Sequence, residues 1–155
     1  GIRREVAAVL MVQDHRFPHV LVLKSRKMAS FFLPGGRLRP GESDAEGLQR
    51  KLTKKLRAAS SDDFQWDIGE KIASWWSPDF SSHKFPYIPA HVTKPKLVLN
   101  VYTVQLKASC SFAVMNNLDI LAVPLFEVYS RPEKYGPVIS SLPTLLSRFH
   151  MNYLD

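Results

Sequence analysis

The residues whose types and spacing could do chemistry lie between positions 33 and 57, in the stretch LPGGRLRPGESDAEGLQRKLTKKLR. A Gly-Gly pair and a Pro-Gly pair interrupt its first half and predict turns. Ser43 or Asp44 can then cap a helix by accepting a hydrogen bond from a free backbone N–H. Apolar residues at three- and four-residue spacing give that helix one apolar face: Ala45, Leu48, Leu52 and Leu56. The stretch predicts a loop, a strand and a helix that ends between residues 57 and 61.

The charges on this helix have the wrong sign for a metal site. Mg²⁺ binds carboxylate and phosphate oxygens, whereas Lys51, Lys54 and Lys55 would repel it. Glu42 and Glu46 are the glutamates that remain, and two acids do not make a cluster. The sequence therefore excludes ordinary metal-dependent hydrolysis here, and we assign no catalytic residue, no metal ligand and no cofactor.

The basic residues of the stretch allow two interpretations. They could form a patch that faces an anion, or a solvated face that complements the negative end of the helix. The residues concerned are Arg50, Lys51, Lys54, Lys55 and Arg57. We expect the solvated face for Lys54, Lys55 and Arg57.

The composition describes one basic domain. The chain has 155 residues, and 21 Lys and Arg against 14 Asp and Glu give a net charge of +7. This suits one domain over residues 1–155 and an anionic partner, of which nucleic acid is the commonest. Cys110 is the one cysteine, so no internal disulfide can form and a reducing compartment is expected. No apolar run is long enough for a membrane span. Because the chain opens with Gly1, we expect an upstream segment in the natural protein.

The remaining pattern predicts an α/β fold. Strand candidates are 6–13, 20–23, 62–72, 97–106, 112–114 and 121–125. A short helix is expected after Pro124, a tight turn at Lys134–Pro137 and a final amphipathic helix over 142–149. Strands alternating with helices indicate a mixed sheet covered on both faces.

Two aromatic features could bind a partner. Phe31 and Phe32 are consecutive, so along an extended backbone one can be buried while the other stacks on a base. The loop over 77–96 holds four prolines and displays Phe85 and Tyr87, which could form a protein interface or pack back on the domain. His83 and His91 in this loop have no spaced acid or cysteine, so they predict no metal site.

The stretch around the helix resembles the Nudix box. Gly36, Glu42 and Arg50 have the family spacing, and Leu52 fills the apolar position. The positions of the three metal-binding glutamates are occupied by Lys51, Lys54 and Lys55. The resemblance implies the α/β/α Nudix sandwich, with the chemistry of the box inverted.

Several further segments resemble the small subunit of pre-mRNA cleavage factor Im, across nearly the whole chain. These are SWWSPDF, PYIPAHVTKPK, VPLFEVY and YGPVISSLPTLLSRF. The resemblance implies a non-catalytic, nuclear Nudix-fold homodimer that binds UGUA elements in single-stranded pre-mRNA and recruits a larger subunit. A membrane or DNA partner is not expected.

The resemblance also implies site residues. An aromatic ahead of LPGG stacks on RNA in the family, which implies Phe31 or Phe32 here, and Tyr135-Gly136 borders the same RNA site. The surface for the larger subunit corresponds to Phe85, Tyr87 and Leu145, with Phe85 in place of a tyrosine. The family often has a glutamate in the first strand, where this chain has Ala7.

Three hypotheses follow for the function. The first is a non-catalytic RNA-binding subunit of the cleavage and polyadenylation machinery. The second is a diphosphate hydrolase, which lacks a metal site. The third is an assembly scaffold that binds a protein partner but does not recognise RNA. Ala7, which stands where the family often has a glutamate, slightly favours this third hypothesis.

Overall fold

The computed structural model describes residues 2–14, 17–27, 29–58, 66–78, 84–88, 95–105, 112–114 and 118–148. Its strands are β1 (Arg3–Asp14), β2 (Phe17–Ser25), β3 (Phe31–Phe32), β4 (Gly35–Arg37), β5 (Leu56–Ala58), β6 (Asp67–Ser77), β7 (Leu97–Gln105), β8 (Phe112–Val114) and β9 (Leu118–Pro124). Its helices are α1 (Asp44–Lys55), α2 (Leu125–Ser130), α3 (Pro132–Ser140) and α4 (Leu142–Leu146). His83, His91, Cys110 and Phe149 lie outside the described residues. None of the described helices is long and apolar enough to cross a membrane.

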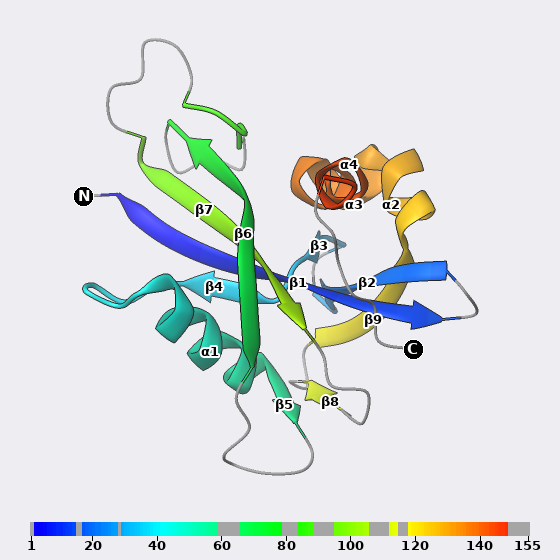
Figure 1. The fold of residues 1–155 in the computed structure, drawn as a ribbon, viewed down its shortest axis with the longest axis horizontal. Coiled ribbons are helices and arrows are strands. Elements are labelled where there is room, and N and C mark those ends of the chain that lie inside the picture. The colour runs from blue at the N-terminus through cyan, green and yellow to red at the C-terminus, as the bar shows by residue number, and fades with distance from the viewer. Residues whose placement is uncertain are drawn as a thin grey trace.

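The main sheet has the order β3-β2-β1-β7-β6, with β9 paired to β2 and β4 paired to β1. The β1–β7 pair is parallel and the other pairs are antiparallel, so the sheet is mixed, as predicted. A separate two-stranded sheet joins β5 to β8. Helix α1 covers one face of the main sheet, and α2–α4 cover the other (Figure 1). The predicted sandwich of two helical layers around a mixed sheet is confirmed.

Alternation along β1 creates the two cores. Ala7, Val9 and Met11 face helices α2–α4, and the residues between them face α1. Strand β2 repeats the pattern with Val20 and Val22 on the α2–α4 side. This is the period-two pattern of a strand that is buried on both faces.

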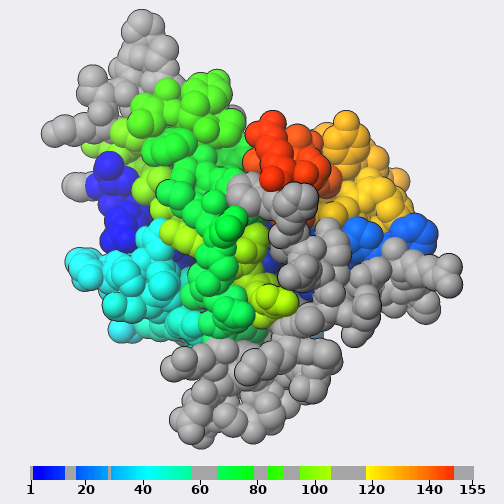
Figure 2. Space-filling model, in the orientation of Figure 1, coloured from blue at the N-terminus to red at the C-terminus, as the bar shows by residue number. Residues whose placement is uncertain are grey.

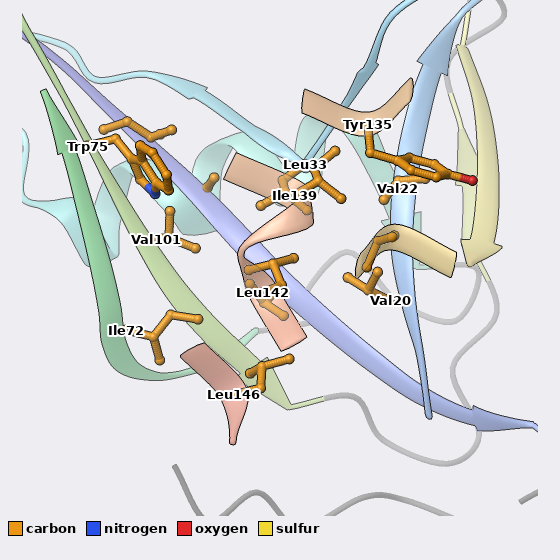
Figure 3. Packing of buried hydrophobic residues seen from close by; sticks show 14 of the residues in the cluster. Val20, Val22, Leu33, Ile72, Trp75, Val101, Tyr135, Ile139, Leu142 and Leu146 are labelled. Carbon is orange, nitrogen blue, oxygen red and sulfur yellow. The ribbon is translucent and has the colours of Figure 1, made fainter. Parts of the chain in front are cut away.

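The core beneath α3 and α4 combines residues from distant parts of the chain. Figure 3 shows side chains of β2, β6 and β7 meeting those of the last two helices. The labelled residues are Val20, Val22, Leu33, Ile72, Trp75, Val101, Tyr135, Ile139, Leu142 and Leu146. In the space-filling view, the green strand β6 separates the cyan α1 side from the orange and red helices (Figure 2).

Several predicted boundaries are wrong. The strand predicted to end at residue 72 continues to Ser77, and the final helix, predicted to run to residue 149, ends at Leu146. Helix α1 ends at Lys55, before the predicted limit of 57–61, because Leu56–Ala58 pairs with β8. The segment Lys134–Pro137 is not an isolated tight turn but part of α3, which is broken at Gly136, where φ is 84° and ψ is 168°. Glycine adopts this positive φ without steric cost, and Pro137 then restarts the helix.

Burial of the apolar face of α1 should be the main source of its stability. Leu52 is fully buried in the core between α1 and the sheet, so Leu52→Ala should lower the free energy of unfolding by about 2–5 kcal/mol. Thr53→Ala, at an exposed position of the same helix, should change it by less than about 0.5 kcal/mol. Urea unfolding measures both, and equal effects would contradict this packing.

Candidate nucleotide-binding site and partner surface

A pocket of about 320 Å³ opens where β1, the segment 31–36 and helix α3 meet. The first part of β1 pairs with β4, and its last part pairs with β2. The pocket opens between these two pairings, where the chain passes from β3, which pairs with β2, to β4. Its lining includes all four residues that were predicted to bind RNA: Phe31, Phe32, Tyr135 and Gly136. The fold therefore brings together residues about 100 positions apart.

Phe31 and Phe32 point to opposite faces of the sheet, as predicted for consecutive residues of a strand. Phe31 packs against the core under α3, and Phe32 packs against the core under α1. Both rings are half-buried, so each keeps some surface in the pocket. The exposure of the two rings therefore does not determine whether Phe31 or Phe32 stacks on a base.

Cations surround the Phe31 ring. The Nζ atom of Lys24 lies 5.6 Å from its centroid, and that of Lys134 lies 5.7 Å away. The Tyr135 ring stands 4.9 Å from Phe31 between centroids, at a tilt of 51°. This rim combines aromatic faces with positive charge, which is the combination that single-stranded nucleic acids favour.

Tyr135 is a fixed wall of the pocket. Its side chain is buried, and its hydroxyl donates a hydrogen bond to the Glu127 carboxylate. Burial, followed by this contact with Glu127, raises the pKa of Tyr135 to about 12. The phenol therefore stays neutral at physiological pH and holds α3 to α2.

The Glu42 carboxylate is fully engaged within the box. It accepts two hydrogen bonds of 2.9 Å from Arg50, one at each oxygen, and another of 2.9 Å from the Arg39 backbone N–H. The hydrogen bond from Arg50 is the main reason that the pKa of Glu42 falls to about 2. Arg50 also donates to the Arg37 carbonyl oxygen at 3.3 Å. Arg50 is thus a structural clamp and not part of an anion-facing patch.

The expectation of a solvated face is wrong for Lys55. Its Nζ donates to the Gly35 carbonyl oxygen, and the side chain lines the pocket, half-buried. Lys51 lies one helical turn earlier on the same side of α1, and its side chain also runs past the glycine pair, at Gly36. Lys54 is exposed, as expected. The side chain of Arg57 lies outside the described part of the chain.

A divalent metal does not fit this box. The three positions that would supply carboxylates carry ammonium groups, and Glu42 is paired with Arg50. Within the described residues, no group of three or more His, Cys, Asp or Glu side chains could hold a metal ion. Hard cations require oxygen ligands, so no reaction step through Mg²⁺ can be built on these side chains.

Asp44 anchors the start of α1 to the sheet. It accepts hydrogen bonds from Arg4 at 2.8 Å, from Asn100 at 2.9 Å and from the Tyr102 hydroxyl. Burial opposes ionisation, but these three contacts outweigh it and lower the pKa of Asp44. The cap itself is Ser43, whose hydroxyl accepts the Glu46 backbone N–H at 3.2 Å. Of the two predicted cap candidates, Ser43 is the cap and Asp44 is the anchor.

Two charged residues of the pocket were missed by the sequence analysis. Glu5 lines the pocket two positions before Ala7, and the period-two alternation of β1 could have shown that they share a face. Lys84 lines it from the proline-rich loop, and no periodic signal in the sequence indicates that placement. The pocket lining therefore holds one carboxylate, that of Glu5, and two ammonium groups, those of Lys55 and Lys84.

The predicted partner residues lie on neighbouring elements. Phe85 forms an isolated bridge with Trp76 of β6, with backbone hydrogen bonds of 2.7 and 2.8 Å. Its ring lies 5.7 Å from that of Tyr87, which is 57% exposed. Leu145 is half-buried on α4, the helix that contacts β6. Of the described residues 84–88, Phe85 is thus joined to the domain by backbone hydrogen bonds, whereas the Tyr87 ring remains exposed.

Comparison with known proteins agrees with this architecture. A Nudix family model described as "Nucleotide hydrolase" matches residues 1–149. Among solved structures, an Ap4A hydrolase of C. elegans in a binary complex superposes with a TM-score of 0.66 at 15% identity, covering 96% of this chain and 97% of that one. The fold and the frame of the box define a Nudix-fold protein.

Two curated relatives are much more similar. "Cleavage and polyadenylation specificity factor subunit 5" of Dictyostelium discoideum is 45% identical over 157 residues, covering 100% of this chain and 78% of that protein. "Pre-mRNA cleavage factor Im 25 kDa subunit 2" of Arabidopsis thaliana is 48% identical over 158 residues, with the same two coverages. The chain belongs to the family of the 25 kDa subunit of pre-mRNA cleavage factor Im.

The clamp on Glu42 predicts its titration. Glu42 should titrate near pH 2 by carboxyl NMR, and Arg50→Gln should move the midpoint towards the ordinary value of 4.5. Because the folded-state pKa is the lower one, the stabilisation is complete above about pH 4.5 and is lost as the pH falls towards about 2. Lys54→Gln removes the same charge from an exposed position of the helix and should leave the midpoint in place. A wild-type midpoint near 4.5 would contradict the clamp.

Proposed function

We propose that this protein is a non-catalytic RNA-binding subunit of the nuclear pre-mRNA cleavage and polyadenylation machinery. The observation that supports this most is the convergence of Phe31, Phe32, Tyr135 and Gly136 on one pocket with a positively charged rim. Its relatives are named as subunits of cleavage factors. The ligand is single-stranded RNA of UGUA type.

The pocket can recognise a base in two ways. A free face of Phe31 or Phe32 provides stacking, which tolerates any base. Recognition of the base edge needs hydrogen-bonding groups, and the Glu5 carboxylate is an acceptor on the pocket lining, on the same strand face as Ala7. Glu5 thereby compensates for the missing glutamate at position 7, which weakens the case for a scaffold that no longer reads RNA.

A hydrolase is the less favoured function. Metal-assisted attack on a diphosphate needs a bound cation to activate water and neutralise charge. Glu42 is held by Arg50, and the flanking positions are lysines. The box therefore supports recognition without cleavage.

The second surface recruits a larger subunit. Phe85 and Tyr87 present two adjoining aromatic rings, and Leu145 lies on the helix that packs on the neighbouring strand. Partly exposed aromatic residues are typical anchors of protein interfaces. Phe85 directly follows Lys84 of the pocket, so RNA and partner would bind side by side. The protein acts as a homodimer in this assembly.

RNA recognition should depend on one of the two phenylalanines. Affinity for a UGUA-containing RNA should exceed that for a scrambled RNA, measured by fluorescence anisotropy with any upstream segment of the natural protein included. Phe31→Ala or Phe32→Ala should weaken binding by about 1–3 kcal/mol, the typical value of base–aromatic stacking.

Phe126→Ala is the matched control for this loss. That ring is 64% exposed and is not part of the pocket lining, so its removal should leave RNA affinity unchanged. Equal affinity for the UGUA-containing and the scrambled RNA would contradict sequence-specific recognition. Full retention of affinity in both pocket variants would show that the bases bind elsewhere.

Partner binding should separate from RNA binding. The double variant Phe85→Ala, Tyr87→Ala should lose co-purification of the larger subunit, because it removes both rings of the aromatic pair, and RNA affinity should not change. Phe17→Ala, which removes a 54% exposed ring elsewhere, is the control. Loss of both activities together, with a lowered melting temperature, would instead indicate a folding defect.

A further inference from the structure

Four cations gather beside the pocket, over strand β4 and helix α1, two elements that contact each other (Figure 1). They are Arg37 at the end of β4, Arg39 shortly after it, and Lys51 and Lys54 on α1. Three of them are exposed, and Lys51 is half-buried. We refer to these four residues as the α1 basic surface.

The members of this surface lie close to one another. Lys51 and Lys54 are three residues apart on the helix, so they are neighbours on its surface. Burial lowers the pKa of Lys51, and the charges of three nearby cations lower it further, those of Arg50, Lys54 and Arg39. The side chain of Lys51 also passes over β4, where a Cβ atom on Gly36 would lie 2.9 Å from its Cε. Cations of the helix and of the preceding loop therefore meet in one place.

The acids near this surface are engaged elsewhere. Glu42 is paired with Arg50 at 2.9 Å, and Asp44 is paired with Arg4 at 2.8 Å. Glu46 lies in the first turn of α1, before the lysines. Among the described residues, none of the four cations is ion-paired with an acid. Their positive charge is therefore available to a partner.

The helix alone does not explain these charges. Cations complement the negative end of a helix only within its last turn, where Lys54 lies. Lys51 precedes that turn, and Arg37 and Arg39 are not part of the helix. A solvated helix face therefore accounts for one of the four cations.

The α1 basic surface is continuous with the pocket. Gly36, which Lys51 covers, is part of the pocket lining. Arg37 follows it and stands opposite Glu5, another lining residue, in the ladder between β1 and β4. An RNA held by its bases in the pocket carries a negative charge at every flanking nucleotide. This continuity favours RNA over an acidic protein segment as the partner of the surface.

We propose that the α1 basic surface binds the phosphate backbone of RNA nucleotides that flank the recognised element, outside the pocket. The RNA footprint is therefore longer than the UGUA element and continues over β4 and α1. Contacts of this kind position a nucleic acid and add affinity without reading its sequence. The proposal rests on the proposed function, because the pocket must hold the neighbouring element.

Fluorescence anisotropy with the full-length protein tests this footprint. A short RNA with the UGUA element is compared with RNAs that add about ten uridines at its 5′ or its 3′ end. One of the extended RNAs should bind at least about fivefold more tightly than the short RNA at low salt, and its log–log salt dependence should be steeper by roughly 0.7 for each phosphate contacted. Neutral methylphosphonates in place of the phosphates of that extension should remove the gain.

Matched arginine variants locate the contact. Arg39→Gln and Arg148→Gln each remove one exposed positive charge, but Arg148 follows α4, on the opposite side of the sheet (Figure 1). Arg39→Gln should reduce the gain from the extension about two- to threefold and lower the salt slope by roughly 0.7, whereas Arg148→Gln should change neither. The double variant Arg39→Gln, Lys54→Gln should remove most of the gain. Affinity for the short RNA should stay the same in all three variants, because none of these side chains lines the pocket.

Equal affinity for the short RNA and both extended RNAs would overturn the proposal and leave the surface to an acidic partner protein. A gain that survives methylphosphonate substitution, or that Arg39→Gln and Arg148→Gln reduce equally, would overturn it as well. Failure of the proposed function gives a different result. The short RNA would then bind no better than a scrambled one, while the extension would still add affinity that Arg39→Gln reduces.

Discussion

The ion pair between Arg50 and Glu42 holds the Nudix frame together in this protein. Its two hydrogen bonds of 2.9 Å tie helix α1 to the loop that precedes it, and the Arg39 N–H completes the clamp. Through Arg50 the helix also holds the Arg37 carbonyl at the end of β4. The clamp uses the one box glutamate that remains, so both oxygens of this carboxylate are already hydrogen-bonded within the protein.

The second constraint is the alternation of β1. Odd-numbered residues from Ala7 to Met11 face α2–α4 and even-numbered ones face α1, and the pocket opens beside Glu5, Val6 and Ala7 of this strand. Asp44 then fixes the start of α1 to Arg4 of the same strand. Strand β1 therefore positions both the pocket and the start of helix α1. The aromatic rings and lysines that line this pocket come from segments far apart in the sequence.

Much of this arrangement could be predicted from local pattern. The long strands, a helix cap at Ser43 or Asp44 and the opposite orientation of Phe31 and Phe32 follow from periodicity and backbone geometry. The position of Lys55 did not, because it depends on a contact with the Gly35 carbonyl oxygen, 20 residues earlier in the chain, which helical periodicity does not show. Lys84 was also unpredictable, since its place in the pocket depends on a bridge between Phe85 and Trp76.

We infer that the positive charge in this box comes from the lysines of the protein and not from a bound metal. The most direct measurement is a Mn²⁺ titration followed by paramagnetic broadening of backbone NMR signals, combined with a turnover assay on a dinucleoside polyphosphate. We predict no saturable broadening around Glu42 and Gly36 and no metal-dependent turnover. Saturable broadening centred on Glu42, with hydrolysis of the phosphate bond at the same Mn²⁺ concentrations, would instead show that a metal binds and acts in this box.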